Sequence, residues 1–178
     1  IVPATTADDI AQNDVVLGLS DAAPVVHEPF AQWVIEDRFS AGRPAWEAAG
    51  ATFVRHVEHF ESMKLRLLNA SHSAFAYLGY LAGHEFIYQV AAQPEFVAFM
   101  RRFTADEVTP ALVAPPGIDL AEYRETLVRR FANPALPHRT QQIAMDGSQK
   151  LPQRILATIR DNLAADRPVE LASLAVAG

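Results

Sequence analysis

The sequence has no cysteine, which excludes both a disulfide framework and a metal site built on thiolates. Positive charge is also scarce: the formal net charge is −6, and no basic stripe is interleaved with aromatic residues. A protein that binds the phosphate backbone of a nucleic acid needs such a basic face, so we expect no nucleic-acid partner. No apolar run approaches the length of a membrane span. We therefore expect a protein of the reducing cytoplasm without a membrane partner.

The residues that are present favour a helical domain. Half of the 178 residues are apolar and 20% are charged, which is the composition of a globular domain with its own core. Residues 1–24 contain turn and cap formers and are expected to be loop-like at first. Residues 30–35 are rich in β-branched and aromatic residues and are expected to be extended. The break at Ser40–Pro44 is followed by helical character, so we predict a mainly α, multi-helical fold behind a short extended N-terminal segment.

The predicted helices follow from apolar periodicity and from cap residues. Pro94 is expected at a first helical turn, Asp119 is expected to cap a helix that ends at Phe131, and Gly147-Ser148 is expected to form a turn. The predicted ranges are 46–61, 62–82, 94–108, 119–131, 137–146, 150–164 and a last helix from 168.

The segment Lys64–Ser73 places ionisable and amide groups in an apolar helix. Such groups are costly in apolar surroundings and therefore often have a function. On an α-helix, Lys64 and His72 lie roughly 80° apart and Asn69 lies roughly 140° from Lys64, so the three share one broad side. Lys64 is a candidate acid/base, and Asn69 is a candidate donor to a developing oxyanion. From spacing alone, a snorkelling lysine with two satisfied polar residues remains the alternative.

Two other groups of residues are weaker candidates. Lys150 follows a glycine-containing turn near a predicted helix start, where the helix dipole does not favour a lysine. The alternative interpretation of Lys150 is an exposed surface lysine. His56 and His59 stand three positions apart beside glutamates, but the helical zinc motif has its histidines four positions apart, with a glutamate between them. We interpret this second group as a solvated helix face and expect no metal.

Several stretches together resemble the polyol-specific long-chain dehydrogenase/reductase family, which includes mannitol 2-dehydrogenase and fructuronate reductase. They occur in family order over nearly the whole chain. The matching stretches are IVPATT at 1–6, EPFAQWVIED at 28–37, GRP at 42–44, MKLRLLNASHS at 63–73, YLGYLAG at 77–83, RFANP at 130–134 and IAMDGSQKLP at 143–152.

The resemblance implies a domain organisation. Family members have an upstream dinucleotide-binding domain, and residues 1–44 look like its tail and the interdomain joint. Residues 45–178 would then be the helical catalytic and substrate domain, truncated at its C-terminus. None of the eight glycines forms G-x-G-x-x-G, so the cofactor fingerprint is absent from this sequence. We therefore expect the isolated chain to be inactive.

The resemblance also implies roles for individual residues. The family interconverts a secondary alcohol and a ketone with NAD or NADP and without catalytic zinc. Carried over by motif, Lys64 is the general acid/base, Asn69 is an oxyanion-hole donor, His72 binds a substrate hydroxyl, and Lys150 is another polar contact. A free lysine is too basic for this task near neutrality, so we hypothesise that burial and a nearby Lys150 lower the pKa of Lys64.

The substrate is expected to be a small sugar acid or polyol. The run from His138 to Lys150 resembles the fructuronate reductase branch, and Gln142 stands where the mannitol branch usually has arginine. A sugar acid needs a cationic partner for its carboxylate, and His138, Arg139 and Arg154 are candidates. We predict mannonate and fructuronate, with mannitol and fructose as the alternative. A non-enzymatic helical interaction domain is the alternative of another class, since residues 30–35 could form an unpaired strand edge.

Overall fold

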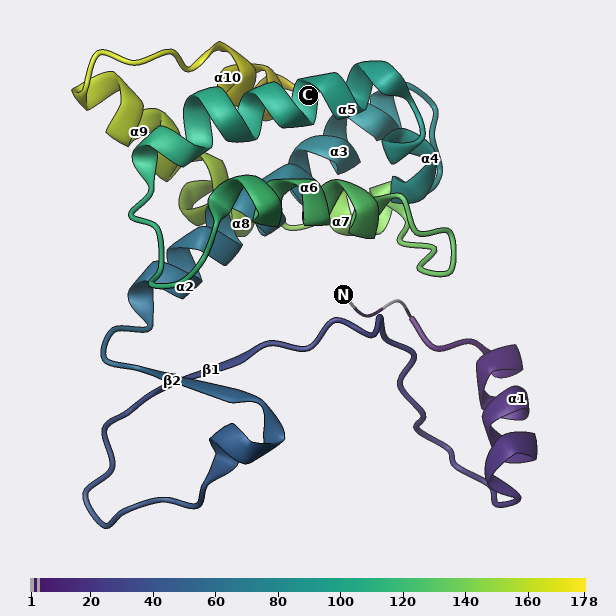
Figure 1. Cartoon of the computed structure of the whole chain (residues 1–178). Helices are drawn as coiled ribbons and strands as arrows, with labels where there is room; N and C mark the ends of the chain where they lie inside the picture. The colour runs from purple at the N-terminus through teal and green to yellow at the C-terminus, as the bar shows by residue number, and fades with distance from the viewer. Residues whose placement is uncertain (1, 3) are drawn as a thin grey trace.

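The structure, a computed structural model, describes residue 2 and residues 4–178. Residues 1 and 3, which belong to the first matching stretch, lie outside the described residues. The predicted mainly α class is confirmed: a helical body carries a largely extended N-terminal arm (Figure 1). The arm contains α1 (Ala7–Leu17), β1 (Trp33–Glu36), the 3-10 turn η1 (Trp46–Ala49) and β2 (Ala51–Val54).

The helices of the body fall into consecutive segments, three of which are π-helical and one of which, η4, is a 3-10 turn. In chain order they are α2 (Glu58–Met63), η2 (Lys64–Asn69), α3 (Ala70–Leu81), α4 (Ile87–Ala91), α5 (Pro94–Arg102), η3 (Phe103–Val108), η4 (Thr109–Ala111), α6 (Leu120–Phe131), α7 (Thr140–Ala144), α8 (Gly147–Leu151), η5 (Pro152–Leu156), α9 (Ala157–Ala164) and α10 (Glu170–Ala177). The predicted roles of Pro94 and Asp119 as the first residue and the cap of a helix are confirmed.

The first 24 residues contain a helix that the sequence reasoning missed. Thr6 and Asp9 form a reciprocal capping box, in which each side chain accepts a backbone N–H of the other residue. The helix ends at Gly18 in a left-handed conformation, with φ at 67°. Asp9 stands at the position where a capping box usually has glutamate or glutamine. α1 buries none of its side chains and lies apart from the helical body (Figure 1).

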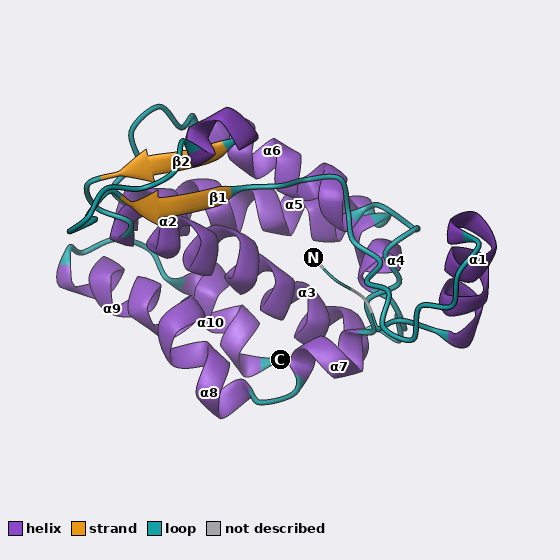
Figure 2. Ribbon diagram, turned by 90° about the horizontal axis from the view of Figure 1, so that it is seen from below, coloured by secondary structure: helices purple, strands orange, loops and turns teal. Residues whose placement is uncertain are grey.

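The helix predicted over residues 46–61 is wrong for its first half. Gly50 has φ at 91° and ends a single 3-10 turn. The next residues form β2, which pairs in parallel with β1 so that Trp33 lies opposite Ala51 (Figure 2). β-Branched and aromatic side chains in 51–54 favour a strand once glycine has ended the turn. The helix resumes only at Glu58.

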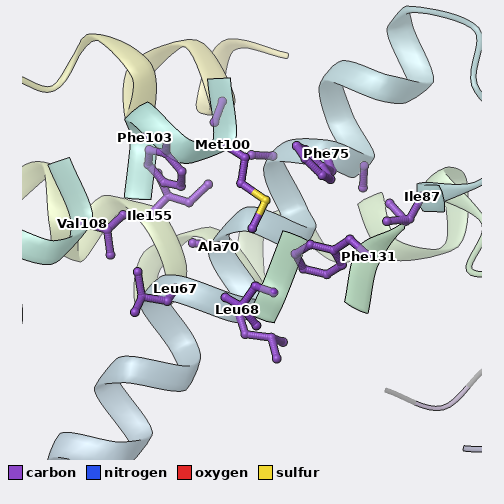
Figure 3. Close-up of a cluster of buried hydrophobic side chains, with 14 of the residues drawn as sticks. Leu67, Leu68, Ala70, Phe75, Ile87, Met100, Phe103, Val108, Phe131 and Ile155 are labelled. Atoms are coloured by element: carbon purple, nitrogen blue, oxygen red, sulfur yellow. The ribbon is translucent and has the colours of Figure 1, made fainter. Parts of the chain in front are cut away.

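A long central helix organises the body. α2, η2 and α3 follow one another without a break in helical conformation and run through the middle of the fold (Figure 1). Their buried side chains pack against those of the surrounding helices to form the core (Figure 3). On α3, Gly79 is required for packing, since an added Cβ would lie 2.3 Å from the side chain of Val90. The predicted buried helix over 62–82 is thus confirmed.

A buried ion pair fastens the arm to the body. Glu28 receives two hydrogen bonds from the guanidinium of Arg130 on α6, at 2.7 and 2.8 Å. The same guanidinium lies over the ring of Phe30, 4.1 Å from its centroid. Burial acts to raise the pKa of Glu28, the hydrogen bond and the charge of Arg130 act to lower it, and the pKa lies below its usual value. The pair therefore fixes residues 28–30 against α6.

A buried carboxylate caps the last helix. Glu107 on η3 is 1% exposed and accepts the backbone N–H groups of Leu171 and Ala172, both at 2.7 Å. Glu107→Ala would leave these donors of the first turn of α10 unpaired. We expect the free energy of unfolding to fall by about 3 kcal/mol, measured by urea denaturation. Glu61→Ala, which removes an exposed carboxylate from α2, is the control. Equal effects of the two substitutions would contradict the capping role.

Candidate active site

The π-helical segment η2 changes the geometry expected for Lys64 and Asn69. The backbone N–H of Ala70 donates to the carbonyl oxygen of Leu65, five residues back, as in a π-helix. In a π turn, residues five positions apart lie on nearly the same face of the helix, as residues four positions apart do in an α-helix. Lys64 and Asn69 therefore lie on nearly one face. The separation of roughly 140° expected from an α-helix was wrong for this reason.

Lys64 is exposed in this chain. The described residues do not bury its side chain, whereas burial was expected from sequence. Asn69, one turn further along the helix, is half-buried. The two side chains thus stand at a surface of the helical body.

His72 is buried and neutral. Its side chain lies among Phe131 and His138, with ring centroids 5.2 and 5.5 Å away, and only 7% of the residue is exposed. Burial, followed by the charges of His138 and Arg154, lowers the pKa of His72 to about 3. Its Nε2 is buried and has no hydrogen-bond partner among the described residues. A neutral imidazole with a free ring nitrogen is a hydrogen-bonding group available to a ligand.

The turn that carries Lys150 is centred on Asp146. Asp146 has φ at 59°, a left-handed conformation that aspartate tolerates, and α8 begins directly after it at Gly147. The turn predicted at Gly147-Ser148 is therefore wrong by two residues. The Lys150 ammonium is partly buried and donates to the carbonyl oxygens of Ile143 and Met145. Its charge is the smallest of the contributions that lower the pKa of His72.

The three other candidate substrate ligands differ in their surroundings. His138 is buried beside His72, and burial lowers the pKa of its imidazole. Arg139 forms an ion pair with Glu85, so its charge is already matched. Gln142 is exposed on α7. Arg139 also lines a hollow with Tyr80 at the C-terminal end of α3, away from Lys64.

Sequence reasoning missed two polar side chains that face Arg154. Ser73 accepts a hydrogen bond of 3.0 Å from Nη1 of Arg154. The hydroxyl of Tyr77 is buried without a hydrogen-bond partner among the described residues. The available signal was the spacing of four residues between Ser73 and Tyr77, which puts both on one face of the helix that carries His72.

The described part of the chain contains neither a cluster of metal ligands nor a membrane-spanning helix. Its histidine, aspartate and glutamate side chains do not form a group of three or more arranged to hold a metal ion. The histidine and glutamate pair at His56 and Glu58 is exposed, with Nδ1 and Oε2 4.0 Å apart. No helix formed by the described residues combines the length and the apolarity needed to cross a membrane.

Comparison with known proteins defines the class of this fold. A family model described as the mannitol dehydrogenase C-terminal domain matches residues 56–178. The chain is therefore a mainly α domain of a dehydrogenase family, and it belongs to the mannitol dehydrogenase C-terminal domain family. This result confirms the resemblance found in the sequence motifs.

Three relatives illustrate the similarity. The uncharacterized oxidoreductase YdfI of Escherichia coli (strain K12) is 51% identical over the whole chain and 36% of its own length. D-Mannonate oxidoreductase of the same organism is 48% identical over the whole chain and 37% of its length. The ternary complex of Pseudomonas fluorescens mannitol 2-dehydrogenase with NAD and D-mannitol superposes with a TM-score of 0.90 and 45% identity, over 99% of this chain and 36% of that one. The chain thus spans little more than a third of these proteins.

Proposed function

We propose that this chain is the substrate-binding and catalytic part of an NAD-dependent oxidoreductase that interconverts a secondary alcohol and its ketone on a sugar acid or polyol. The central helix supports this proposal most directly. Its π turn aligns Lys64 with Asn69, and the free Nε2 of His72 follows one α-helical turn later. A base, an oxyanion donor and a hydroxyl ligand are the groups that such a reaction requires.

The proposed roles follow from the chemistry of each side chain. The amine of Lys64 takes the hydroxyl proton during oxidation and returns it during reduction. The amide of Asn69 donates a hydrogen bond to the oxygen on which negative charge develops. Nε2 of the neutral His72 binds an adjacent substrate hydroxyl and so fixes the reacting carbon relative to Lys64. Lys150 adds a polar contact from the turn before α8.

The cofactor is proposed to be NAD, which is bound in the ternary complex of Pseudomonas fluorescens mannitol 2-dehydrogenase. When bound, a nicotinamide accepts or supplies the hydride at the carbinol carbon. The sequence lacks the glycine fingerprint that holds a pyrophosphate at a helix start, so we assign most cofactor binding to the part of the longer protein outside this chain. The exposed position of Lys64 is consistent with a site completed by that part. We propose residues 1–44 as the joint between the two parts.

A sugar acid is proposed as the substrate class, with mannonate and fructuronate the preferred pair. The absence of arginine at position 142 and the cationic residues around His72 support this choice over mannitol. The identity to D-mannonate oxidoreductase, 48%, is also higher than the 45% to the Pseudomonas mannitol 2-dehydrogenase. Mannitol and fructose remain the alternative pair that the experiment must include.

The test is an assay of the full-length protein with fructuronate, tagaturonate and fructose as acceptors of hydride from NADH. We expect the highest kcat/KM for fructuronate. The present chain, assayed alone under the same conditions, is expected to show no NADH oxidation. Turnover of fructose but of neither sugar acid would defeat the sugar-acid proposal, and activity of the isolated chain would defeat the assignment of cofactor binding to another part.

A further inference from the structure

Arg154 on η5 is a cation without a counter-ion among the described residues. Its Nη1 donates to the hydroxyl of Ser73, a neutral acceptor, at 3.0 Å. Its Nε is buried and has no hydrogen-bond partner there. Two partly buried arginines of other helices have carboxylate partners instead: Arg66 pairs with Asp161, and Arg130 pairs with Glu28.

Such an arrangement is unfavourable in the absence of a ligand. A buried donor on a charged group that lacks an acceptor costs more than a neutral one, because the group gives up its hydration without compensation. Burial correspondingly lowers the pKa of the Arg154 guanidinium. A carboxylate at this position would accept from the guanidinium in the bidentate geometry that both groups favour.

A second unpaired donor lies at the same place. Tyr77 is one turn along α3 from Ser73 and is half-buried, and its buried hydroxyl has no hydrogen-bond partner among the described residues. Burial raises the pKa of this phenol, while the nearby charge of Arg154 acts in the opposite direction. The hydroxyl therefore stays protonated and can donate. Arg154 and Tyr77 thus present two donor groups and no anion.

The position of these donors connects them to His72. Ser73 is the next residue to His72 on α3, and the charges of both Arg154 and Lys150 reach the imidazole of His72. The charged groups that act on this imidazole are cations. An extended six-carbon sugar acid that places one hydroxyl at His72 would carry its carboxylate a few bonds away, and Arg154 is hydrogen-bonded to Ser73, the next residue of the same helix.

We propose that Arg154 and Tyr77 bind the carboxylate of the substrate and so determine preference for sugar acids over neutral polyols. The inference rests on the proposed function and specifies its substrate class. Ser73 acts as a positioning residue, since its hydroxyl orients the guanidinium of Arg154. Buried water is the other possible occupant of such a polar space, and the experiment below distinguishes the two.

The test compares variants of the full-length enzyme with fructuronate and fructose. Arg154→Met is expected to raise KM for fructuronate about a hundredfold and to leave kcat within about threefold, because a charge-assisted contact made equally in the ground state and the transition state is lost. Arg154→Lys keeps the charge without the bidentate fork, so an intermediate KM is expected. Arg160→Met, which removes an exposed cation from α9, is the matched control and should change neither constant.

Tyr77→Phe removes only the hydroxyl and preserves the packing of the ring. We expect KM for fructuronate to rise about fivefold to tenfold and KM for fructose to stay the same. Equal losses with fructuronate and fructose in the Arg154 and Tyr77 variants would overturn the inference in favour of a structural or water-filled site. Unchanged KM for fructuronate would also overturn it. Wild-type enzyme that reduces none of the tested substrates would instead defeat the proposed function itself.

Discussion

Replacing Lys64 with methionine in the full-length enzyme is expected to lower kcat about a thousandfold. General acid/base catalysis by one positioned side chain contributes about a hundredfold to ten-thousandfold, and methionine keeps the length and the apolar stem of lysine without the amine. Because Lys64 is exposed in this chain, the substitution is expected to leave the free energy of unfolding nearly unchanged. Steady-state kinetics and urea denaturation of the same preparation measure the two effects.

Added methylammonium should restore part of the activity of the Lys64→Met variant, since a small amine can occupy the space of the missing group. Arg160→Met provides the control for the loss of one positive charge and is expected to have wild-type kcat. Loss of less than about tenfold in kcat, or an equal loss in the Arg160 variant, would remove Lys64 from the role of acid/base.

Acidification is expected to destabilise this chain through His72. The folded imidazole has a pKa of about 3 and an unfolded imidazole has one of about 6.5, so the unfolded state binds the additional proton. The neutral imidazole of His72 makes its full contribution to the free energy of unfolding above pH 6.5, and this contribution is lost as pH falls from 6.5 towards 3. From pH 7.5 to pH 5, before most carboxylates titrate, His72 alone should lower the free energy of unfolding by about 2 kcal/mol.

The measurement is a series of urea denaturations between pH 7.5 and pH 5. His72→Gln, which cannot protonate, is expected to lose about 2 kcal/mol less than the wild type over this range. His56→Gln removes an exposed histidine and should follow the wild-type curve. Parallel curves for the wild type and the His72 variant would show that the buried imidazole does not control acid stability.

The fold was predictable where local signals and packing agree. Pro94 and Asp119 begin their helices as expected, because a first-turn proline and an N-terminal aspartate act through the backbone of their own segment. β2 was not predictable in the same way. Ala51–Val54 is a strand because it has β1 as a partner across a loop, and a single window of sequence does not contain that partner.

The candidate site was predictable in its residues but only in part in its geometry. The motifs identified Lys64, Asn69 and His72, whereas the π turn that relates the first two leaves no mark in hydrophobic periodicity. The exposure of Lys64 was also missed, because the surroundings of a side chain depend on segments distant in the chain. Tyr77 was not identified as a site residue, because the charge of Arg154 acts on it only in the folded chain.

The extra residue in the hydrogen-bond ladder of η2 has a consequence for how this helix tolerates length changes. Deleting one residue between Lys64 and Asn69 would let the segment return to an ordinary α-helix without breaking the chain or moving its ends far. Lys64 and Asn69 would then stand four residues apart in an α-helix, which is the relation that they already have across the π turn. Both the identity and the phase of the two site residues would survive. The π turn therefore holds one residue more than an α-helix needs, without changing the face that Lys64 and Asn69 share.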